Sequence, residues 1–462
     1  MSKEWGRGLG LACALASGVL WLLSRDIGPF GPLILVAPVP ILVYALKSRQ
    51  ALSVAFFCLL ARVIGGAGLI LAYGRVMSLI YVLVLAQGLL FVAIARFVAA
   101  LDRRFPPWVA AMGFAITISA LDFLIGFISP NGSFGDLGYS LVDVLPLLQV
   151  VSLGGICALS FLAAIVPGAL SLMIARGFRW SVLAVAVLPV IAACAYGFYQ
   201  LQPRPSLHVR VAVLADNSQP HHAETAAQSH ALAETYAGEA EAQRAQYIVL
   251  PEKIVIRRPG WGDLDAPFQA AADHTGATVV AGFDDTPDHG ARVNTAHIYR
   301  PDMPSVLYLK RHMVPGLEAM FTPGKVSYVD GSVGVAICKD MDFPMTIRQY
   351  GKAGVKLMLV PAWDFGLDGR LHARMATVRA VENGFALARA ASDGRVTIND
   401  AQGRVVAEAD STPPRPVAVT AEVALGSGAT VYGRYGDGFG WLMTVVLAAV
   451  ATMLVVRRND IT

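Results

Sequence analysis

The segment SVGVAICKDMDFP, residues 332–344, is the part of the sequence that decides the fold of the soluble region. The run SVGVAI predicts a buried strand that ends at Cys338, and Pro344 marks the start of a helix a few residues later. A strand followed through a short turn by a helix is the repeating step of an α/β domain. Residues at the carboxyl ends of strands build the functional site in such sheets. Cys338 is therefore the first candidate for a functional residue.

The alternation of strands and helices continues on both sides of this segment. Predicted strands cover residues 208–215, 247–250, 278–282, 295–299, 305–309, 332–337, 355–360 and 386–391, and predicted helices cover residues 223–244, 265–275, 344–350 and 372–382. This pattern predicts one α/β domain of roughly 225 residues, within the usual size range of domains. Glu252 and Lys310 also follow strands directly, so we expect them to converge with Cys338.

These three residue types together carry the chemistry of acyl transfer through a thioester. A cysteine attacks as the thiolate, and a carboxylate such as that of Glu252 can take its proton and return it to a leaving group. The ammonium of Lys310 can hold the negative oxygen that develops on an attacked carbonyl. The backbone N–H of Lys339 is a candidate second oxyanion donor, and Glu318 is a candidate for orienting Lys310 or the incoming nucleophile. The set predicts nucleophilic catalysis by Cys338.

Each residue taken alone also has a structural interpretation. A single cysteine after a strand is often a buried core residue. Glu252 is equally typical of a solvated loop, and Lys310 with its basic neighbours is typical of an exposed turn. His372 fits a base or a ligand, but also an ordinary residue on a helix face. The interpretation as a catalytic site depends on these residues meeting in space.

Metal and nucleic-acid functions find no support in the sequence. The adjacent His221 and His222 lack the third ligand spacing of a zinc site, so we expect no metal and no cofactor. The net charge is +4, and no run rich in Lys and Arg is interleaved with aromatic residues. Nucleic-acid binding is therefore excluded as a leading interpretation.

The composition divides the chain into a membrane part and a water-exposed part. Hydrophobic residues make up 55% of the chain and charged residues 15%, whereas soluble proteins carry roughly 25% charged residues. The apolar residues concentrate in 1–201 and 440–456. We therefore expect a helical membrane domain at 1–205, a soluble domain at 206–432, and a last membrane helix with a tail at 433–462.

Eight segments have the length and apolar character that a membrane span of about 20 residues requires. They are Leu9–Leu23, Phe30–Leu46, Ala51–Tyr73, Met77–Leu101, Trp108–Phe127, Val151–Ile174, Trp180–Leu201 and Trp441–Val456. The second contains Pro32, Pro38 and Pro40, so we expect it to be kinked or broken.

The distribution of Lys and Arg predicts the orientation. Basic residues gather in the loops on the side of the two termini, whereas the short loops on the other side hold only Arg25 and Arg75. The positive-inside rule places both termini in the cytoplasm and the soluble domain outside. The predicted location is a bacterial inner membrane, with multiple spans and a periplasmic catalytic domain. Cys338 is the single cysteine of the soluble region, so that domain forms no internal disulfide.

Two ionisable residues, Arg62 and Asp122, lie within predicted spans. Charged groups there are costly and usually face the interior of the helix bundle. One interpretation is a polar cavity or a contact with lipid headgroups. The other is a structural ion pair, or a side chain of Asp122 that reaches toward the outer surface.

Several separate motifs resemble the nitrilase superfamily of carbon-nitrogen hydrolases. They are YIVLPEK (247–253), YLKRHMVPGLE (308–318), VAICKDMDFP (335–344), LVPAW (359–363) and RAVENG (379–384). The resemblance implies an αββα sandwich and a Glu–Lys–Cys triad at Glu252, Lys310 and Cys338. It further implies that Glu318, Lys339 and Asp340 supply an oxyanion donor or orient the triad.

The membrane part narrows the resemblance to the apolipoprotein N-acyltransferases. The stretch LGYSLVDVLPLLQVVSLGGICALSFLAA (137–164), the order of spans and the tract HARMATVRAVENG (372–384) are similar to that family. The resemblance implies that Cys338 takes a fatty acyl chain from a phospholipid, with phosphatidylethanolamine as the expected donor. The acceptor it implies is the N-terminal amine of a diacylglyceryl-cysteine lipoprotein.

Apolar residues near the predicted site are candidates for contacting lipid. Met320, Phe321, Trp363, Phe365 and Leu367 lie in predicted loops and are expected as exposed lid residues, although Trp363 also fits the domain core. Our candidates for substrate binding are Met320, Phe321, Trp363 and His372.

The chain also departs from the acyltransferase motifs. Lys339-Asp340 stands where that family has Tyr-Glu, VPGLE (314–318) replaces VPFGE, and VPAWDFG (360–366) resembles soluble nitrilases. A membrane-anchored amidase that uses water as acceptor is the second interpretation. A non-catalytic scaffold is the third, and the intact triad argues against it.

Overall fold

A computed structural model describes residues 6–219, 223–287 and 290–459 of the chain. His221 and His222 lie outside the described residues. The chain divides into two compact units. The helical unit comprises Met1–Ser129, Ser133–Gln202 and Asp437–Thr462, and the sandwich unit comprises Pro130–Gly132 and Pro203–Gly436. Residues 130–132 thus belong to the sandwich unit, although in the sequence they come between two helices of the helical unit.

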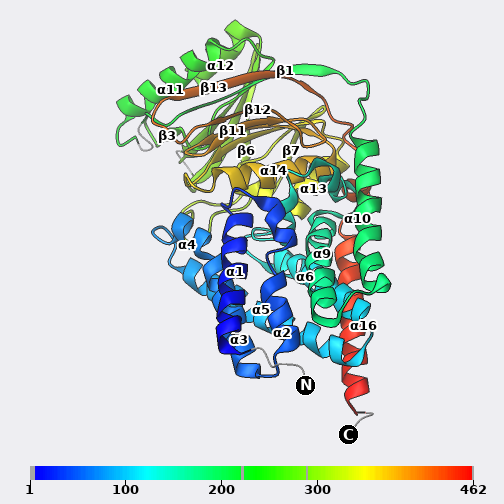
Figure 1. Cartoon of the computed structure of the whole chain (residues 1–462). Coiled ribbons are helices and arrows are strands. Elements are labelled where there is room, and N and C mark those ends of the chain that lie inside the picture. Colours follow the sequence, from blue (N-terminus) through cyan, green and yellow to red (C-terminus); the bar gives the residue numbers. More distant parts are fainter. Residues whose placement is uncertain (1–5, 220–222, 288–289, 460–462) are drawn as a thin grey trace. The chain divides into compact units, whose positions relative to one another are not determined.

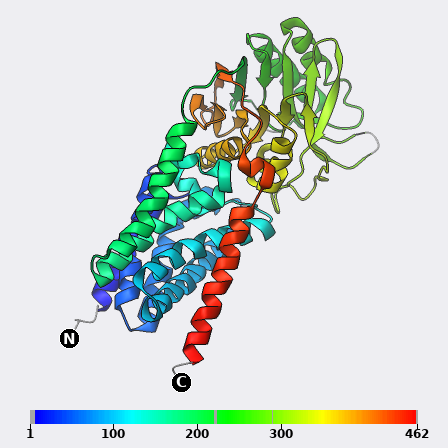
Figure 2. The ribbon, with the colours of Figure 1, turned by 90° about the vertical axis from the view of Figure 1, so that its right-hand side faces the viewer.

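The helical unit is built from apolar helices (Figures 1 and 2). Its α-helices are α1 (Arg7–Ser24), α2 (Val39–Lys47), α3 (Ala51–Gly65), α4 (Ala67–Tyr73), α5 (Leu79–Arg104), α6 (Pro107–Ile128), α7 (Leu145–Leu148), α8 (Val151–Gly154), α9 (Ile156–Arg176), α10 (Trp180–Gln200) and α16 (Gly438–Asn459). Two 3₁₀ helices, η1 (Gly31–Leu35) and η2 (Leu137–Leu141), connect them.

Among the described residues, six helices are long and apolar enough to cross a membrane, and seven if the bent pair α3 and α4 counts as one span. The prediction of eight spans is therefore not confirmed. The difference lies at Phe30–Leu46, which forms η1 and the nine-residue helix α2. Prolines at the start of both helices interrupt the backbone hydrogen bonding there. A helix of nine residues is only about 14 Å long, less than half the thickness of the hydrocarbon core.

The two ionisable residues predicted within spans, Arg62 and Asp122, have neutral partners within the helical unit. Arg62 donates a hydrogen bond of 3.0 Å to Oε1 of Gln87, and its guanidinium lies 4.9 Å from the centroid of the Trp21 ring. Oδ2 of Asp122 accepts a hydrogen bond of 2.9 Å from the backbone N–H of Leu137. These contacts lower the cost of placing ionisable groups in an apolar bundle.

The sandwich unit contains two β-sheets. The first pairs the strands in the order β13-β1-β2-β4-β5-β6, with β3 also paired to β4. These strands are β13 (Pro416–Ala424), β1 (His208–Asp216), β2 (Tyr247–Val249), β3 (Val255–Arg257), β4 (Thr278–Asp285), β5 (Val293–Arg300) and β6 (Met303–Leu309). The second has the order β12-β11-β10-β9-β8-β7. Its strands are β12 (Val405–Asp410), β11 (Arg395–Asn399), β10 (Ala386–Ser392), β9 (Leu357–Trp363), β8 (Val333–Val335) and β7 (Tyr328–Asp330).

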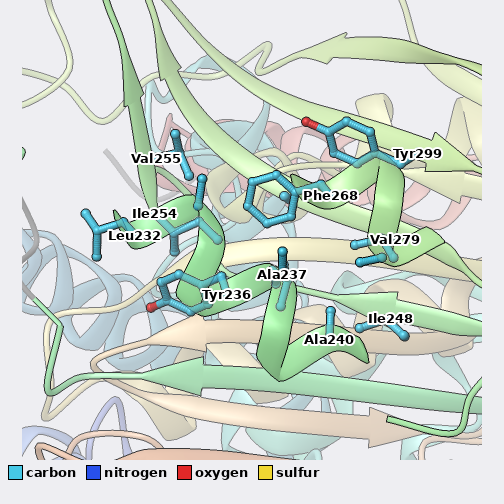
Figure 3. Packing of buried hydrophobic residues seen from close by; sticks show 14 of the residues in the cluster. Leu232, Tyr236, Ala237, Ala240, Ile248, Ile254, Val255, Phe268, Val279 and Tyr299 are labelled. Atoms are coloured by element: carbon cyan, nitrogen blue, oxygen red, sulfur yellow. The ribbon is translucent and has the colours of Figure 1, made fainter. Parts of the chain in front are cut away.

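Three apolar layers hold this unit together and define it as an αββα sandwich. The first layer packs α11 (Ala226–Glu241) and α12 (Ala266–Thr275) on the first sheet. Figure 3 shows Tyr236 and Phe268 from these helices against Ile248 and Val279 of the strands. The second layer lies between the sheets, and the third packs α13 (Pro344–Lys352) and α14 (Gly369–Asn383) on the second sheet. The predicted fold class of a helical membrane domain with an αββα sandwich domain is confirmed.

Five strands that the sequence did not predict complete the two sheets: β3, β7, β11, β12 and β13. The longest, β13, pairs antiparallel with β1 from His208 opposite Ala424 to Asp216 opposite Pro416. Most residues of β12 and β13 are exposed or only partly buried, so neither strand carries a clear apolar pattern. β3 and β7 have three residues each, too few to show a periodicity.

Candidate active site

Glu252 lies in a tight turn that follows β2 and faces the second sheet. Its backbone N–H donates a hydrogen bond of 3.2 Å to the carbonyl of Ala362 at the end of β9. The turn passes over Gly282 of β4, where a Cβ atom would lie 2.4 Å from the carbonyl oxygen of Pro251 and 2.5 Å from Cα of Glu252. Glycine is required at this close approach. The Glu252 side chain is 1% exposed, so the turn presents a carboxylate inside the domain.

Lys310 follows β6 and meets Glu252 directly. Its backbone N–H donates to the carbonyl of Asn294 on β5 at 2.9 Å, which fixes the end of the strand. Nζ lies 2.8 Å from Oε1 of Glu252 and 2.7 Å from Oε2 of Glu318, and the side chain is 1% exposed. Burial opposes the charge of Lys310, but Glu252, Glu318 and Cys338 together raise its pKa well above the ordinary value. Lys310 is therefore a permanent cation.

Glu318 completes the group and is held by four donors. Its carboxylate accepts hydrogen bonds from Lys310, from Nζ of Lys253 at 2.8 Å, from Nδ2 of Asn294 at 3.1 Å and from the backbone N–H of Val314 at 2.9 Å. Burial acts to raise its pKa, but Lys310 and Lys253 lower it to about 2. Glu318 is ionised at neutral pH. We call Glu252, Lys310, Glu318 and Asn294 the catalytic cluster, a name that states the role we propose for them.

Asn294 is a member of this cluster that the sequence analysis missed. Its Nδ2 donates to Glu252 at 2.6 Å as well as to Glu318, so one amide joins both carboxylates. It is the second residue of β5, where it points toward the space between the sheets. In the sequence it is a polar residue just before the predicted strand 295–299, a signal too weak to be separated from an ordinary strand end.

Cys338 lies at the point where the chain leaves β8 and enters η3 (Cys338–Asp342). Its φ is +41°, a region that residues other than glycine rarely adopt and that costs about 1–3 kcal/mol. The thiol is half-buried and donates to the carbonyl of Trp363 at 3.4 Å. Burial and the charge of Glu252 raise the pKa of this thiol, while Lys310 and Arg389 oppose the rise. The resting group is thus a neutral thiol whose pKa depends on Glu252 and Lys310.

Asp340 connects the turn at Cys338 to the segment that carries Lys310. Its carboxylate accepts from the backbone N–H groups of Ile337 at 3.0 Å, Arg311 at 3.0 Å and His312 at 2.9 Å. The hydroxyl of Tyr308 donates to it at 2.8 Å. Burial raises its pKa to about 6 against these hydrogen bonds. Asp340 therefore orients two backbone segments.

The side chain of Lys339 contacts a different group of residues. Its Nζ donates to Oδ1 of Asn131 at 3.0 Å and lies 3.5 Å from Oδ2 of Asp342. Gly132 packs against the same turn, because a Cβ atom there would lie 2.3 Å from the carbonyl oxygen of Asp342. Residues 130–132 therefore contact both ends of η3.

A buried ion pair, also missed by the sequence analysis, lies behind Cys338. Arg389 of β10 donates to both oxygens of Asp364, once at 2.9 Å, and the two residues are 2% and 1% exposed. The pKa of Asp364 rises with burial, which Arg389 opposes. Asp364 follows Trp363 directly, so this pair fixes the carbonyl that accepts the thiol hydrogen.

His372 of α14 lies between two carboxylates. Its Nε2 lies 3.2 Å from Oδ2 of Asp368, and its Nδ1 lies 3.9 Å from Oδ1 of Asp342. Burial disfavours the charged ring, but Asp368, Asp342 and Asp364 raise its pKa to about 9. The ring is a cation at neutral pH and has no free pair for accepting a proton.

The apolar candidates differ in exposure. Met320 and Leu367 are exposed, whereas Trp363 and Phe365 are partly buried. The expectation that Phe321 is exposed is wrong, since its side chain is 8% exposed. Its ring is covered by cations, with Arg292 at 4.8 Å and Nζ of Lys253 at 5.8 Å from the centroid. Cation–π contacts of this kind hold an aromatic ring within a polar loop.

Comparisons with known proteins found family matches for both the helical part and the α/β part of the chain. Residues 210–430 match the carbon-nitrogen hydrolase family, and residues 17–169 match the apolipoprotein N-acyltransferase N-terminal domain. An apolipoprotein N-acyltransferase of Geobacter metallireducens is 28% identical over 97% of this chain and 95% of its own length. One from Rhodopseudomonas palustris is 26% identical over 80% of this chain and 77% of its own length. The structure of an amidase from Nesterenkonia aligns with a TM-score of 0.39 and 22% identity, covering 48% of this chain and 93% of the amidase.

Proposed function

Since the chain belongs to the apolipoprotein N-acyltransferase family of the nitrilase superfamily, we propose that it moves a fatty acyl chain from a phospholipid to a lipoprotein amine. The acceptor in this proposal is the N-terminal amine of a diacylglyceryl-cysteine apolipoprotein, and phosphatidylethanolamine is the donor. The observation that carries the proposal is the buried contact of Lys310 with Glu252 and Glu318, because the charges of Lys310 and Glu252 both act on the thiol of Cys338.

The first half-reaction forms a thioester on Cys338. Because the resting thiol is neutral, its proton passes to Glu252 as Sγ attacks the ester carbonyl. The ammonium of Lys310 and the backbone N–H of Lys339 stabilise the negative oxygen of the tetrahedral intermediate. When the intermediate collapses, the ester C–O bond breaks and Glu252 returns its proton to the departing alcohol. The products are a lysophospholipid and the acyl-enzyme.

The second half-reaction uses the same groups in the reverse sense. The lipoprotein amine attacks the thioester carbonyl and passes one proton to Glu252. The C–S bond then breaks, and Glu252 returns this proton to the sulfur, which restores the thiol and releases the amide. Glu318 keeps the ammonium of Lys310 in position through both halves.

The membrane setting fits two lipid substrates. Several helices of the chain are apolar and long enough to cross a membrane, so donor and acceptor can reach the enzyme without leaving the bilayer. The distribution of Lys and Arg supports cytoplasmic termini and a periplasmic catalytic domain in a bacterial inner membrane. Restricted access of water protects a thioester from hydrolysis.

Intact mass spectrometry of the purified full-length protein tests this function. After incubation with vesicles of phosphatidylethanolamine, we expect a mass increase equal to one acyl chain, and hydroxylamine should remove it. The variant Cys338→Ala should fold and insert but carry no adduct and show no turnover. Full activity of Cys338→Ala would eliminate the covalent mechanism.

The acceptor is tested on the acylated protein. Addition of a diacylated lipopeptide with a free N-terminal amine should discharge the adduct and produce a triacylated peptide, while buffer alone leaves the adduct in place. An adduct that water discharges as fast as the lipopeptide does, or release of ammonia from simple amides without an adduct, would support the amidase instead.

A further inference from the structure

A second lysine enters the active site beside Lys310. Lys253 follows Glu252 directly, and its Nζ lies 2.8 Å from Oε1 of Glu318 and 3.9 Å from Oε1 of Glu252. The side chain is 20% exposed, so the ammonium is largely withdrawn from water. Its position is also bounded by aromatic rings, with the centroid of Trp363 at 5.2 Å and that of Phe321 at 5.8 Å. An ammonium between two rings and two carboxylates is held in one place.

The charges of this site balance only if Lys253 is included. The catalytic cluster contains two carboxylates, Glu252 and Glu318, and one ammonium, Lys310, which contacts both. Those three groups alone carry one excess negative charge in a buried space. Lys253 supplies the missing positive charge and binds the carboxylate of Glu318 at the oxygen that Lys310 does not contact.

The backbone at Lys253 indicates that the local structure places this ammonium at some cost. Its φ is +57°, a conformation unfavourable for a side chain of this size. The turn is set by Gly282, where a Cβ atom would lie 2.7 Å from the backbone nitrogen of Lys253. Residues in such conformations persist where the surrounding structure enforces them, and they gather at functional sites.

We propose that Lys253 is a positioning residue that neutralises Glu318, so that the ammonium of Lys310 remains available to Glu252 and to the developing oxyanion. This inference rests on the proposed nucleophilic role of Cys338 and adds a residue to it. Without Lys253, Lys310 alone would have to compensate both carboxylates. The excess negative charge would then oppose formation of the thiolate at Cys338.

The groups that face the thiol are known, so the effect on its reactivity has a definite sign. Glu252 and Asp364 disfavour the thiolate, whereas Lys310 and Arg389 favour it. Lys253 faces the carboxylates of Glu318 and Glu252. The nearby cation Arg292 lies over the Phe321 ring, which also contacts Lys253. Removing one positive charge from this group raises the pKa of the thiol.

The test is the rate of alkylation of Cys338 by iodoacetamide as a function of pH, measured on the full-length protein in detergent. Lys253→Met keeps an unbranched apolar side chain of nearly the same length but removes the charge. We expect its profile to move up by about one pH unit, which slows alkylation at neutral pH about tenfold. Lys253→Arg should retain the parent profile. Lys352→Met, which removes an exposed lysine of α13, is the matched control and should leave the profile unchanged.

A double variant separates charge balance from structural damage. In Lys253→Met with Glu318→Gln, the excess negative charge is gone, so the alkylation profile should return toward that of the parent. A profile of Lys253→Met identical to the parent, or a double variant no faster than Lys253→Met alone, would overturn the role of Lys253.

Acyl adduct formation distinguishes this outcome from failure of the proposed function. If the parent protein forms no adduct, the function is wrong, while the alkylation profiles still report on Lys253. If the parent forms the adduct and Lys253→Met forms it equally fast with an unshifted alkylation profile, the function stands and the inference about Lys253 is wrong.

Discussion

The two faces of strand β5 carry two groups of polar residues, one buried and one partly buried, that differ in their surroundings. On the face toward the second sheet, Asn294 joins the carboxylates of the catalytic cluster. On the face toward α12, His297 and Tyr299 both contact Oδ1 of Asp265, at 2.7 and 2.6 Å. Asp285 lies 3.6 Å from the other ring nitrogen of His297, and Arg257 donates to Asp265 at 2.6 Å. We call His297, Tyr299, Asp265, Asp285 and Arg257 the β5 outer cluster.

The difference between these clusters is what lies beside them. The catalytic cluster adjoins a half-buried thiol and a turn with positive φ at Cys338. The β5 outer cluster adjoins aromatic rings, because His297 stacks on Phe283 at 4.0 Å and Tyr299 stacks on Phe268 at 5.5 Å. Asp265 directly precedes the first residue of α12, and Arg257 belongs to β3, so this cluster attaches a helix and β3 to the sheet. We therefore expect a cluster of charged side chains to form a reactive centre only where a nucleophile lies beside it.

Among the substitutions in the two clusters, Glu252→Gln is expected to have the largest effect, which is a loss of activity. The amide keeps the size of the side chain and an oxygen for Lys310, but it cannot take the thiol proton. We expect kcat for acyl transfer to fall about 10²–10⁴-fold with the melting temperature nearly unchanged. Single-turnover kinetics of adduct formation measure this, and a loss of less than tenfold would remove Glu252 from the role of base.

Asp265→Ala should show the opposite pattern. His297 and Tyr299 lose their shared acceptor inside the domain, and we expect a loss of about 2–3 kcal/mol of stability. Thermal unfolding of the detergent-solubilised protein measures the loss. Glu234→Ala, at an exposed position of α11, is the control and should change little. A tenfold slower adduct formation in folded Asp265→Ala would mean that the outer cluster contributes to the chemistry.

The smallest expected effect is the pH dependence of stability that His372 contributes. Like His297 of the β5 outer cluster, His372 lies between two aspartates. The folded-state pKa of His372 is raised to about 9, above its ordinary value of 6.5. Its stabilisation is therefore complete below about pH 6.5 and is lost as the pH rises through 9. We expect the parent to lose about 2 kcal/mol over this range relative to His372→Gln.

Melting temperatures of both proteins between pH 6 and 9.5 measure this difference. The parent curve should fall toward that of His372→Gln as the pH rises. Parallel curves would show that His372 carries no charge-dependent stabilisation.

The candidate site was partly accessible from the sequence because some of its residues occupy recognisable local positions. Glu252, Lys310 and Cys338 each follow an apolar run that ends a strand, and a parallel arrangement brings such ends together. Asn294 and Glu252 are 42 residues apart, and Asn131 and Lys339 are 208 residues apart. Contacts at such distances along the chain leave no periodic signal, so Asn294, Asn131 and the Arg389–Asp364 pair emerged only in the structure.

The sequence by itself determined the division into an apolar part and an α/β part, the alternation of central strands and helices, and the position of three candidate catalytic side chains at strand ends. Those features follow from the hydrophobic periodicity of neighbouring residues and from strong turn formers. The break in Phe30–Leu46 was likewise expected from its prolines, whereas tertiary structure alone decided that β13 pairs with β1 and that Lys253 faces Glu318. Pairing and charge balance depend on groups brought together from distant parts of the chain, and each such contact forms only when the whole domain has folded.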